Sequence, residues 1–182
     1  MPLSVPVQIE KATFAGGCFW CMEPLFDEIK GVISTTVGYT GGTVPSPSYE
    51  QVSSGKTGHV EAVEILYDPK YVSYENLLTT YWRNIDPTTA HGQFVDFGSQ
   101  YRPVIFYHTE KQKQLAESSK KALSESGRFS KPIVTEIRPG SVFYPAENYH
   151  QDFYKKSPVR YKTYKAGSGR KSFLKKIWDK KK

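Results

Sequence analysis

A glycine pair followed by the only two cysteines of the chain is the feature that most constrains this sequence. Gly16-Gly17 joins an apolar, strand-like run, Thr13-Phe14-Ala15, to a segment of helical composition. Because two glycines let the backbone turn sharply, we expect Cys18 to lie at a helix start, three residues before Cys21. Unpaired N–H groups and the positive end of the helix dipole favour a thiolate at that position. The pattern therefore predicts redox or nucleophilic thiol chemistry.

Two other uses of a C-x-x-C pair have to be weighed, a zinc site and a small structural disulfide. Zinc needs two further ligands, and the four histidines are scattered instead of paired at zinc-site spacing: His59, His91, His108 and His150. A disulfide across so short a loop restrains the unfolded chain little and so stabilises little. Thioredoxin-type motifs normally carry their tryptophan before the first cysteine, whereas Phe19 and Trp20 lie between the two here. We therefore expect no metal and a separate task for the two aromatic residues.

The length and the cysteine usage limit the class of protein. A chain of 182 residues is long enough for one well-packed domain and short for two, so we expect a single domain, 1–182, with a core of about 12–165 and a tail, 166–182. No run approaches the roughly 20 apolar residues of a membrane span, and residues 1–10 lack the basic and apolar regions of an export signal. Two close cysteines without a wider disulfide framework fit a reducing cytoplasm. We expect a cytoplasmic monomer.

The positive charge is concentrated at the end of the chain. Residues 170–182 hold seven basic residues against Asp179, a net charge of +6, which leaves about +1 of the total of +7 for the rest. The body of the chain is thus no basic platform, and we expect no nucleic-acid partner. Four apolar tail residues fall on one helical face: Phe173, Leu174, Ile177 and Trp178. This spacing predicts a terminal helix docked on the domain with its lysines in solvent, and contact with an anionic surface is the alternative.

The order of predicted elements indicates a mixed sheet. Apolar and β-branched runs predict strands at 13–15, 32–39, 59–68, 103–107 and 133–137, and helical patterns occur at 23–30, 73–85, 109–127 and 147–156. A long loop at 88–100 has the length of a functional segment. Two strands follow Gly31 without a helix between them, which disfavours a doubly wound parallel sheet. We predict an α+β fold, a single-domain two-layer α/β sandwich with a ferredoxin-like split βαβ core and long coil segments.

Six short motifs together resemble one known family. They are Gly16-Gly17-Cys18-Phe19-Trp20, Gly38-Tyr39-Thr40-Gly41-Gly42, Thr57-Gly58-His59-Val60-Glu61, Tyr67-Asp68-Pro69, Gly98-Ser99-Gln100-Tyr101-Arg102 and Tyr149-His150-Gln151. Each motif alone is weak, but in this order and spacing they are similar to the A-type peptide methionine sulfoxide reductases, in a variant with Gly-Cys-Phe-Trp-Cys. The resemblance covers about 12–165.

The resemblance implies a substrate and a nucleophile. The substrate would be methionine sulfoxide, free or in oxidised proteins, and only its S epimer, because each of the two reductase types handles one epimer. Cys18 would attack the sulfoxide sulfur, and the departing oxygen needs protons. The resemblance assigns the acid role to Glu61, where burial would raise the pKa and keep the carboxyl protonated. Without it, Glu61 would be interpreted as a carboxylate on the solvated face of a strand.

The remaining site residues also follow from the resemblance. Tyr49 and Tyr101 would donate hydroxyl hydrogen bonds to the sulfoxide oxygen, and Asp96 matches an acidic residue near the cysteine. Phe19 and Trp20 would form an apolar cage for the S-methyl group, with sulfur-aromatic contacts of about 0.3–1.5 kcal/mol each. Taken alone, the aromatic side chains would be interpreted as packing residues and Asp96 as a turn residue. A cage that recognises so little of the peptide implies broad protein substrates.

The chain departs from many relatives in the resolving step. After the first reaction Cys18 is left as a sulfenic acid, which condenses readily with a second thiol. Many relatives supply that thiol from the tail, but this tail has no cysteine, so Cys21 is the only intramolecular candidate. An i, i+3 pair on a helix has Cα atoms about 5 Å apart, within disulfide range, although the first turn must unwind locally. The exposed, strained disulfide would be reduced by thioredoxin, or by dithiothreitol in vitro, and no cofactor is needed.

Two other function classes remain open at this point. A generic thiol-disulfide oxidoreductase would use the cysteine pair directly on protein disulfides, and a nucleic-acid or anionic-surface binding module would use the basic tail. Neither class accounts for the combination of Glu61, Tyr49, Tyr101 and the Phe19-Trp20 pair.

Overall fold

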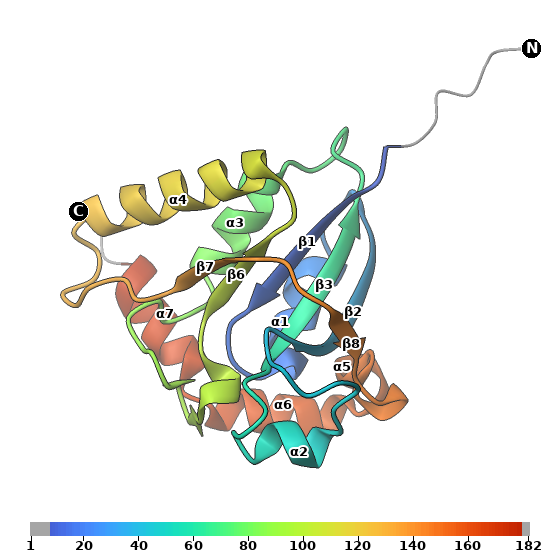
Figure 1. Cartoon of the computed structure of the whole chain (residues 1–182). Coiled ribbons are helices and arrows are strands. Elements are labelled where there is room, and N and C mark those ends of the chain that lie inside the picture. Colours follow the sequence, from blue (N-terminus) through green and yellow to red (C-terminus); the bar gives the residue numbers. More distant parts are fainter. Residues whose placement is uncertain (1–7, 180–182) are drawn as a thin grey trace, which may run out of the picture.

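A six-stranded mixed sheet forms the centre of the structure, a computed structural model that describes residues 8–179 (Figure 1). The strand order is β7-β6-β1-β3-β2-β8, and β6 and β7 run parallel while the other neighbours are antiparallel. The strands of this sheet are β1 (Glu10–Ala15), β2 (Val32–Thr40), β3 (Val60–Tyr67), β6 (Val104–Tyr107), β7 (Glu136–Pro139) and β8 (Phe143–Pro145). The mixed sheet is as predicted.

Two split βαβ units build the middle of the sheet. The first is β1, α1, β2 and the second is β3, α3, β6, and the two interleave in the order β6-β1-β3-β2, the ferredoxin-like arrangement. The helices are α1 (Phe19–Asp27), α2 (Tyr49–Ser53), α3 (Tyr74–Trp82), α4 (Glu110–Glu125), α5 (Phe153–Lys156), α6 (Pro158–Gly167) and α7 (Arg170–Trp178). The predicted α+β class and split βαβ core are therefore confirmed.

Local sequence signals explain where the long helices begin. The Ser73 side chain accepts the N–H of Asn76, and the Asn76 side chain accepts the N–H of Ser73. Helix α3 therefore starts in a capping box. Thr109 caps α4 by accepting the N–H of Gln112. These caps satisfy N–H groups that a helix start leaves unpaired.

The main core lies between the sheet and helices α1, α3 and α4. The ring of Phe14 on β1 stacks on Phe26 of α1 and Tyr81 of α3, at centroid distances of 5.4 Å and 5.0 Å. All three side chains are buried completely. Full burial of such a side chain contributes about 1.5–3 kcal/mol, so this cluster fixes α1, and with it the cysteines, against the sheet.

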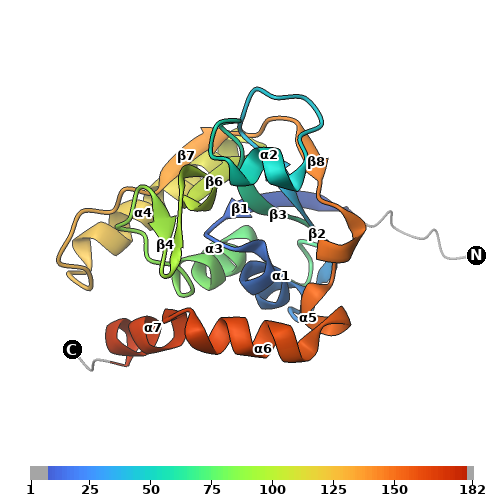
Figure 2. The same ribbon diagram turned by 90° about the horizontal axis from the view of Figure 1, so that it is seen from below.

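The C-terminal helices form an outer layer beside α1 and α3 (Figure 2). The predicted docked helix is present as α7, and its Trp178 packs against the main core. Arg170, expected among the solvated basic residues, is instead only 5% exposed. The preceding helix α6 was not predicted, because its apolar residues are few and its face carries aromatic and basic side chains.

Besides α6, the structure contains α2 and β8, which were not predicted, and three predicted segments differ from their prediction. The last predicted strand, 133–137, begins and ends later in the chain than predicted, as β7. The helix predicted at 147–156 is split into a 3-10 turn, Asn148–His150, and α5, because Asp152 between them has a left-handed backbone with φ 53°. The loop at 88–100 contains a two-stranded sheet, β4 (Gly92–Gln93) and β5 (Asp96–Phe97), and is followed by the 3-10 turn Ser99–Tyr101.

Part of two sequence predictions lies outside the described residues. Residues 1–7 belong to the segment expected to carry no export signal, and residues 180–182 belong to the basic tail. Within residues 8–179, none of the helices has the length and apolar character needed to cross a membrane.

Candidate active site

The turn between β1 and α1 places Cys18 at the helix start, as predicted. Gly17 has φ +92°, a conformation that favours glycine. A Cβ at Gly16 would lie 2.6 Å from Cγ2 of Ile85, so only glycine fits this close approach. Cys18 is the N-cap residue of α1, and its carbonyl accepts the N–H of Cys21 at 3.0 Å. The two cysteines therefore lie at the two ends of one closed turn.

Glu61 lies beside this turn because of the register of the sheet. Phe14 of β1 pairs with Val63 of β3, so Glu61, two residues before Val63, reaches the level of Gly16. Its Oε2 accepts the backbone N–H of Phe19 at 3.0 Å. The side chain is 3% exposed, which places a buried carboxyl at the start of the helix that carries both cysteines.

Burial keeps the Glu61 carboxyl protonated. Desolvation is the main cause that raises its pKa to about 8; the Phe19 N–H acts in the opposite direction, and the nearby Asp96 adds to the rise. A group with this pKa is mostly neutral at pH 7 and can donate a proton. The raised pKa of Glu61 agrees with the direction that the family resemblance implied.

The pKa of the Cys18 thiol departs from the sequence expectation. Burial raises it well above the ordinary value, and the negative charges of Glu61 and Asp96 and the Cys21 thiolate would raise it further. The Trp20 N–H lowers it, which is the predicted helix-start effect, but that effect is outweighed. Without substrate, Cys18 is thus held as a thiol, because a low-polarity site with acidic neighbours penalises a second negative charge.

Two segments of the chain bring Tyr49, Tyr101 and Asp96 to the same region. Tyr49 begins α2, Tyr101 ends the 3-10 turn after β5, and Asp96 lies in β5. The pKa of Tyr101 is raised first by burial and then by the charges of these neighbours: Glu61, Tyr49, Cys18 and Asp96. Asp96 itself accepts a hydrogen bond from the hydroxyl of Tyr164 on α6. Residues far apart in sequence therefore surround Cys18 with hydroxyl and carboxyl groups.

His150 joins the two aromatic residues that lie between the cysteines. The indole N–H of Trp20 donates to Nδ1 of His150 at 3.0 Å, and the His150 ring lies 5.0 Å from the Phe19 ring and 4.7 Å from the Tyr49 ring. Trp20 also stacks on Phe153 at 3.7 Å. Phe19 is fully buried, whereas Trp20 is half-buried. Sequence reasoning did not select His150, although it lies in the Tyr149-His150-Gln151 motif.

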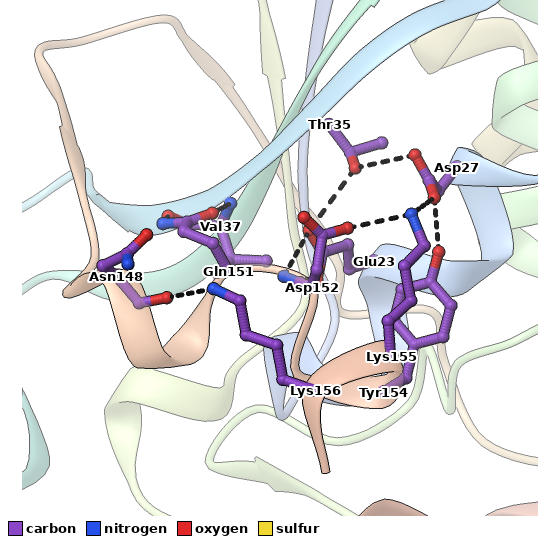
Figure 3. A network of polar contacts seen from close by, with 10 residues as sticks. All are labelled: Glu23, Asp27, Thr35, Val37, Asn148, Gln151, Asp152, Tyr154, Lys155 and Lys156. Atoms are coloured by element: carbon purple, nitrogen blue, oxygen red, sulfur yellow. Dashed lines mark hydrogen bonds and ion pairs between the residues drawn. The ribbon is translucent and has the colours of Figure 1, made fainter. Parts of the chain in front are cut away.

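A network of polar contacts holds the segment that carries His150 (Figure 3). The Gln151 side chain accepts the N–H of Val37 at 2.9 Å and donates to the Val37 carbonyl at 2.8 Å, so it occupies the edge of β2. The N–H of Asp152 donates to the Glu23 carboxyl at 3.0 Å. Lys155 contacts Asp27 at 2.7 Å, which closes the network against the end of α1. The segment is thereby fixed to both α1 and the sheet.

Cys21 is covered more completely than the sequence suggested. Its side chain is 2% exposed and packs against Phe153 and Tyr161 of α5 and α6. Burial raises the pKa of its thiol, and the positive charges of Arg170 and Lys165 act in the opposite direction. Both cysteines are free thiols in this structure, and helices α5 and α6 lie over the Cys21 thiol.

Arg170 of α7 contacts the turn that carries the cysteines. This residue was not identified from the sequence. Its guanidinium donates to the carbonyls of Gly16, at 3.1 Å, and Asn84. The same group lies 4.6 Å from the centroid of the Phe94 ring. No sequence signal distinguishes Arg170 from the other basic tail residues, because its burial follows from the docking of α6 and α7.

Replacing Arg170 is expected to destabilise the fold. Arg170→Met keeps most of the aliphatic stem but leaves two buried carbonyls without a donor, each costing about 1–3 kcal/mol, so the free energy of unfolding should fall by roughly 2–4 kcal/mol. Urea unfolding measures this quantity. The matched control is Lys176→Met on the exposed face of the same helix, with an expected change within about 0.5 kcal/mol. Equal effects of the two variants would contradict the assigned contacts.

Stability should fall as the pH rises from about 5 to about 8. The folded-state pKa of Glu61 is raised to about 8 and that of Glu23 to about 7, both mainly by burial. Each carboxyl binds its proton more tightly in the folded state, so the stabilisation is complete below the unfolded pKa and is lost as pH rises towards the folded pKa. The expected loss is about 6 kcal/mol, more than half of it from Glu61, measured by urea unfolding at the two pH values. A wild-type pH dependence retained in Glu61→Gln/Glu23→Gln would contradict it.

The comparisons with known proteins identify one family. Among the described residues, no three His, Cys, Asp or Glu side chains gather as metal ligands would. The sequence matches the family described as "Peptide methionine sulfoxide reductase" over residues 10–182. Peptide methionine sulfoxide reductase MsrA of Listeria innocua is 58% identical over 170 residues, 93% of this chain and 96% of the relative.

Two solved structures of a yeast protein have the same fold. Reduced Mxr1 from Saccharomyces cerevisiae has a TM-score of 0.78 and 31% identity, over 85% of this chain and 89% of that chain. Mxr1 in complex with Trx2 has a TM-score of 0.58 and 22% identity, over 81% of this chain and 87% of that chain.

Proposed function

Because the chain belongs to the peptide methionine sulfoxide reductase family, we propose that Cys18 reduces the S epimer of methionine sulfoxide, free or in oxidised proteins, back to methionine. The chain is thus an oxidoreductase that acts on a sulfur group. The observation that carries the assignment of roles is the buried, protonated carboxyl of Glu61 at the same helix start as the Cys18 thiol.

The geometry supports a reaction in which two groups act on one S–O bond. Glu61 protonates the sulfoxide oxygen, and the sulfur of Cys18 supplies an electron pair to the sulfoxide sulfur. A bond forms between the two sulfurs, and the S–O bond breaks as the protonated oxygen leaves as water. Water then bonds to the Cys18 sulfur as the sulfur–sulfur bond breaks, so methionine leaves and Cys18 becomes a sulfenic acid. The proton lost by the Cys18 thiol restores Glu61. At the end of the step Glu61 is protonated again, and the second proton is on the oxygen of the sulfenic acid.

The other predicted residues fit supporting roles around the same thiol. The hydroxyls of Tyr49 and Tyr101 donate hydrogen bonds to the sulfoxide oxygen, and raised pKa values keep both groups protonated. Asp96, held by the Tyr164 hydroxyl, adds negative charge near the cysteines. Trp20 packs against the S-methyl group, its indole fixed by His150, while Phe19 supports that wall from the core. These roles require no metal or prosthetic group.

Cys21 resolves the sulfenic acid in the proposed cycle. Its thiol attacks the Cys18 sulfur, a disulfide forms and water leaves. The first turn of α1 must unwind for this, and Pro24 inside the helix supports such a change because it cannot donate a hydrogen bond to the turn that precedes it. We propose thioredoxin as the protein reductant, since yeast Mxr1 forms a complex with Trx2. A cycle that returns both sulfurs to thiols fits a reducing compartment such as the cytoplasm.

The decisive experiment is a mass measurement after adding each sulfoxide epimer without a reductant. With the S epimer, the protein should lose about two mass units, the two hydrogens of the Cys18–Cys21 disulfide, and one equivalent of methionine should form. The R epimer should change neither. Reduction of both epimers alike, or methionine formation without loss of the two hydrogens, would overturn the proposed cycle.

A further inference from the structure

A cavity of about 770 Å³ opens beside Cys21, on the side away from the substrate groups. It lies between helices α1 and α3 and the outer helices α6 and α7, which run alongside them in Figure 2. Cys21 is one of its lining residues, whereas Glu61 and the two site tyrosines are not. The volume is in the range of small-molecule sites. The cavity therefore gives a second approach to the cysteine pair.

The charged lining of this cavity is mainly basic. Its lining residues include five cations, Arg83, Lys165, Arg170, Lys171 and Lys175, and one carboxylate, Asp179. Arg170 is nearly buried, and the lysines are exposed at the entrance. A concave wall of one charge sign raises the local concentration of ligands of the opposite sign. The cavity thus favours an anionic molecule.

The burial of Cys21 restricts how large this molecule can be. Its side chain is 2% exposed beneath α5 and α6, so a folded protein would have to displace helices to bring a thiol to its sulfur. A small molecule that enters the cavity would not. Arg170 and Lys165 both lower the pKa of Cys21 against the effect of burial, which makes Cys21 a better leaving group when a second thiol reduces a mixed disulfide formed on it.

We propose that this cavity binds a small anionic thiol, one that carries carboxylates, and that the thiol reduces the Cys18–Cys21 disulfide by attack at Cys21. The inference rests on the disulfide of the proposed function. The thiolate forms a bond to the Cys21 sulfur, the S–S bond breaks, and Cys18 leaves as a thiolate. A second thiol attacks the outer sulfur of the mixed disulfide and releases Cys21. Two small thiols supply two electrons and two protons and leave as their own disulfide.

The test compares two thiols and two lysine pairs. The full-length protein is converted to its disulfide with methionine S-sulfoxide, and the loss of about two mass units is verified first. Failure at this point would count against the disulfide cycle itself and not against the cavity. Rate constants for reduction are then measured with mercaptosuccinate, which carries two carboxylates, and with neutral 2-mercaptoethanol, each corrected for its thiolate fraction.

The variants separate the cavity from the overall charge of the protein. Lys171→Glu/Lys175→Glu reverses two lining residues, and Lys162→Glu/Lys176→Glu reverses two exposed lysines of the same helices outside the lining. The mercaptosuccinate to 2-mercaptoethanol rate ratio should fall by about tenfold or more in the first pair and by less than about twofold in the second. An equal fall in both pairs, or none in the first, would overturn the proposal.

A second measurement uses the wild-type protein and does not depend on how the variants fold. The reaction with mercaptosuccinate is stopped early with a maleimide, and the cysteines are mapped by peptide mass. The mixed disulfide should be found on Cys21 and the maleimide on Cys18. The opposite distribution would show that electrons enter from the substrate side, as they would for a protein reductant docked over Cys18, and would overturn the proposal.

Discussion

Glu61→Gln is expected to slow the reduction of methionine S-sulfoxide by about 10²–10⁴-fold, the usual contribution of a positioned general acid. Glutamine keeps the size of the side chain and accepts the Phe19 N–H through its amide oxygen, but it has no proton of suitable acidity for the departing oxygen. The measurement is the single-turnover rate with excess enzyme, which follows the chemical step without the recycling of the disulfide.

The pH dependence of the same rate distinguishes the acid role from a structural one. The acid form of Glu61 exists below its pKa of about 8, so the wild-type rate should fall as pH rises through that value when Glu61 is limiting. The Glu61→Gln variant should not show this fall in rate at high pH. Glu64→Gln is the matched control, because Glu64 lies on the same strand but is only half-buried and pairs with Lys11 at 3.1 Å. A wild-type rate in Glu61→Gln would remove Glu61 as the acid.

Cys21→Ser is expected to keep one turnover and to lose recycling. Single-turnover formation of methionine should stay within a few-fold of wild type, because Cys18 and Glu61 are intact. Turnover with thioredoxin should fall by at least about 100-fold, since an intramolecular thiol at high effective concentration is replaced by a hydroxyl that cannot form a disulfide. The protein should accumulate with one added oxygen on Cys18, a mass change that distinguishes it from the disulfide.

Two further variants make this result interpretable. Cys21→Ala tests whether the hydroxyl of serine disturbs the apolar contacts with Phe153 and Tyr161, and it should behave like Cys21→Ser. Cys18→Ser should abolish both the first turnover and recycling. Unchanged thioredoxin-driven turnover in both Cys21 variants would contradict the assignment of Cys21 as the resolving thiol.

Much of the fold could be predicted because its signals are local. The Ser73 and Asn76 capping box marks the start of α3, Thr109 marks α4, and the alternation at 60–67 marks the central strand. The helix expected at 147–156 failed because its interruption is tertiary. Gln151 uses its side chain to pair with the edge of β2, and Asp152 adopts a left-handed backbone that places its N–H against Glu23. Neither requirement is visible in helical composition.

The site residues also divide into those with a local sequence signal and those that depend on tertiary contacts. Cys18 at a helix start follows from the glycine pair, and the resemblance to the reductases identified Glu61 and the tyrosines. The raised pKa of Cys18 did not follow, because it depends first on the burial of the thiol and then on how Glu61 and Asp96 are brought to it by the sheet and by a loop. Arg170 could not be identified either, since its partners Gly16 and Asn84 are distant in sequence.

The contact between Arg170 and Gly16 has a consequence for how the protein is made. The two residues are 154 positions apart, and a chain synthesised from its N-terminus forms this contact only after nearly all other elements have emerged. Until then the nascent protein exposes the carbonyl of Gly16, and until α5 and α6 have emerged it leaves the Cys21 thiol without their cover. Newly made chains are therefore expected to be more easily oxidised than mature ones, and copies that terminate before Arg170 should remain in that vulnerable state.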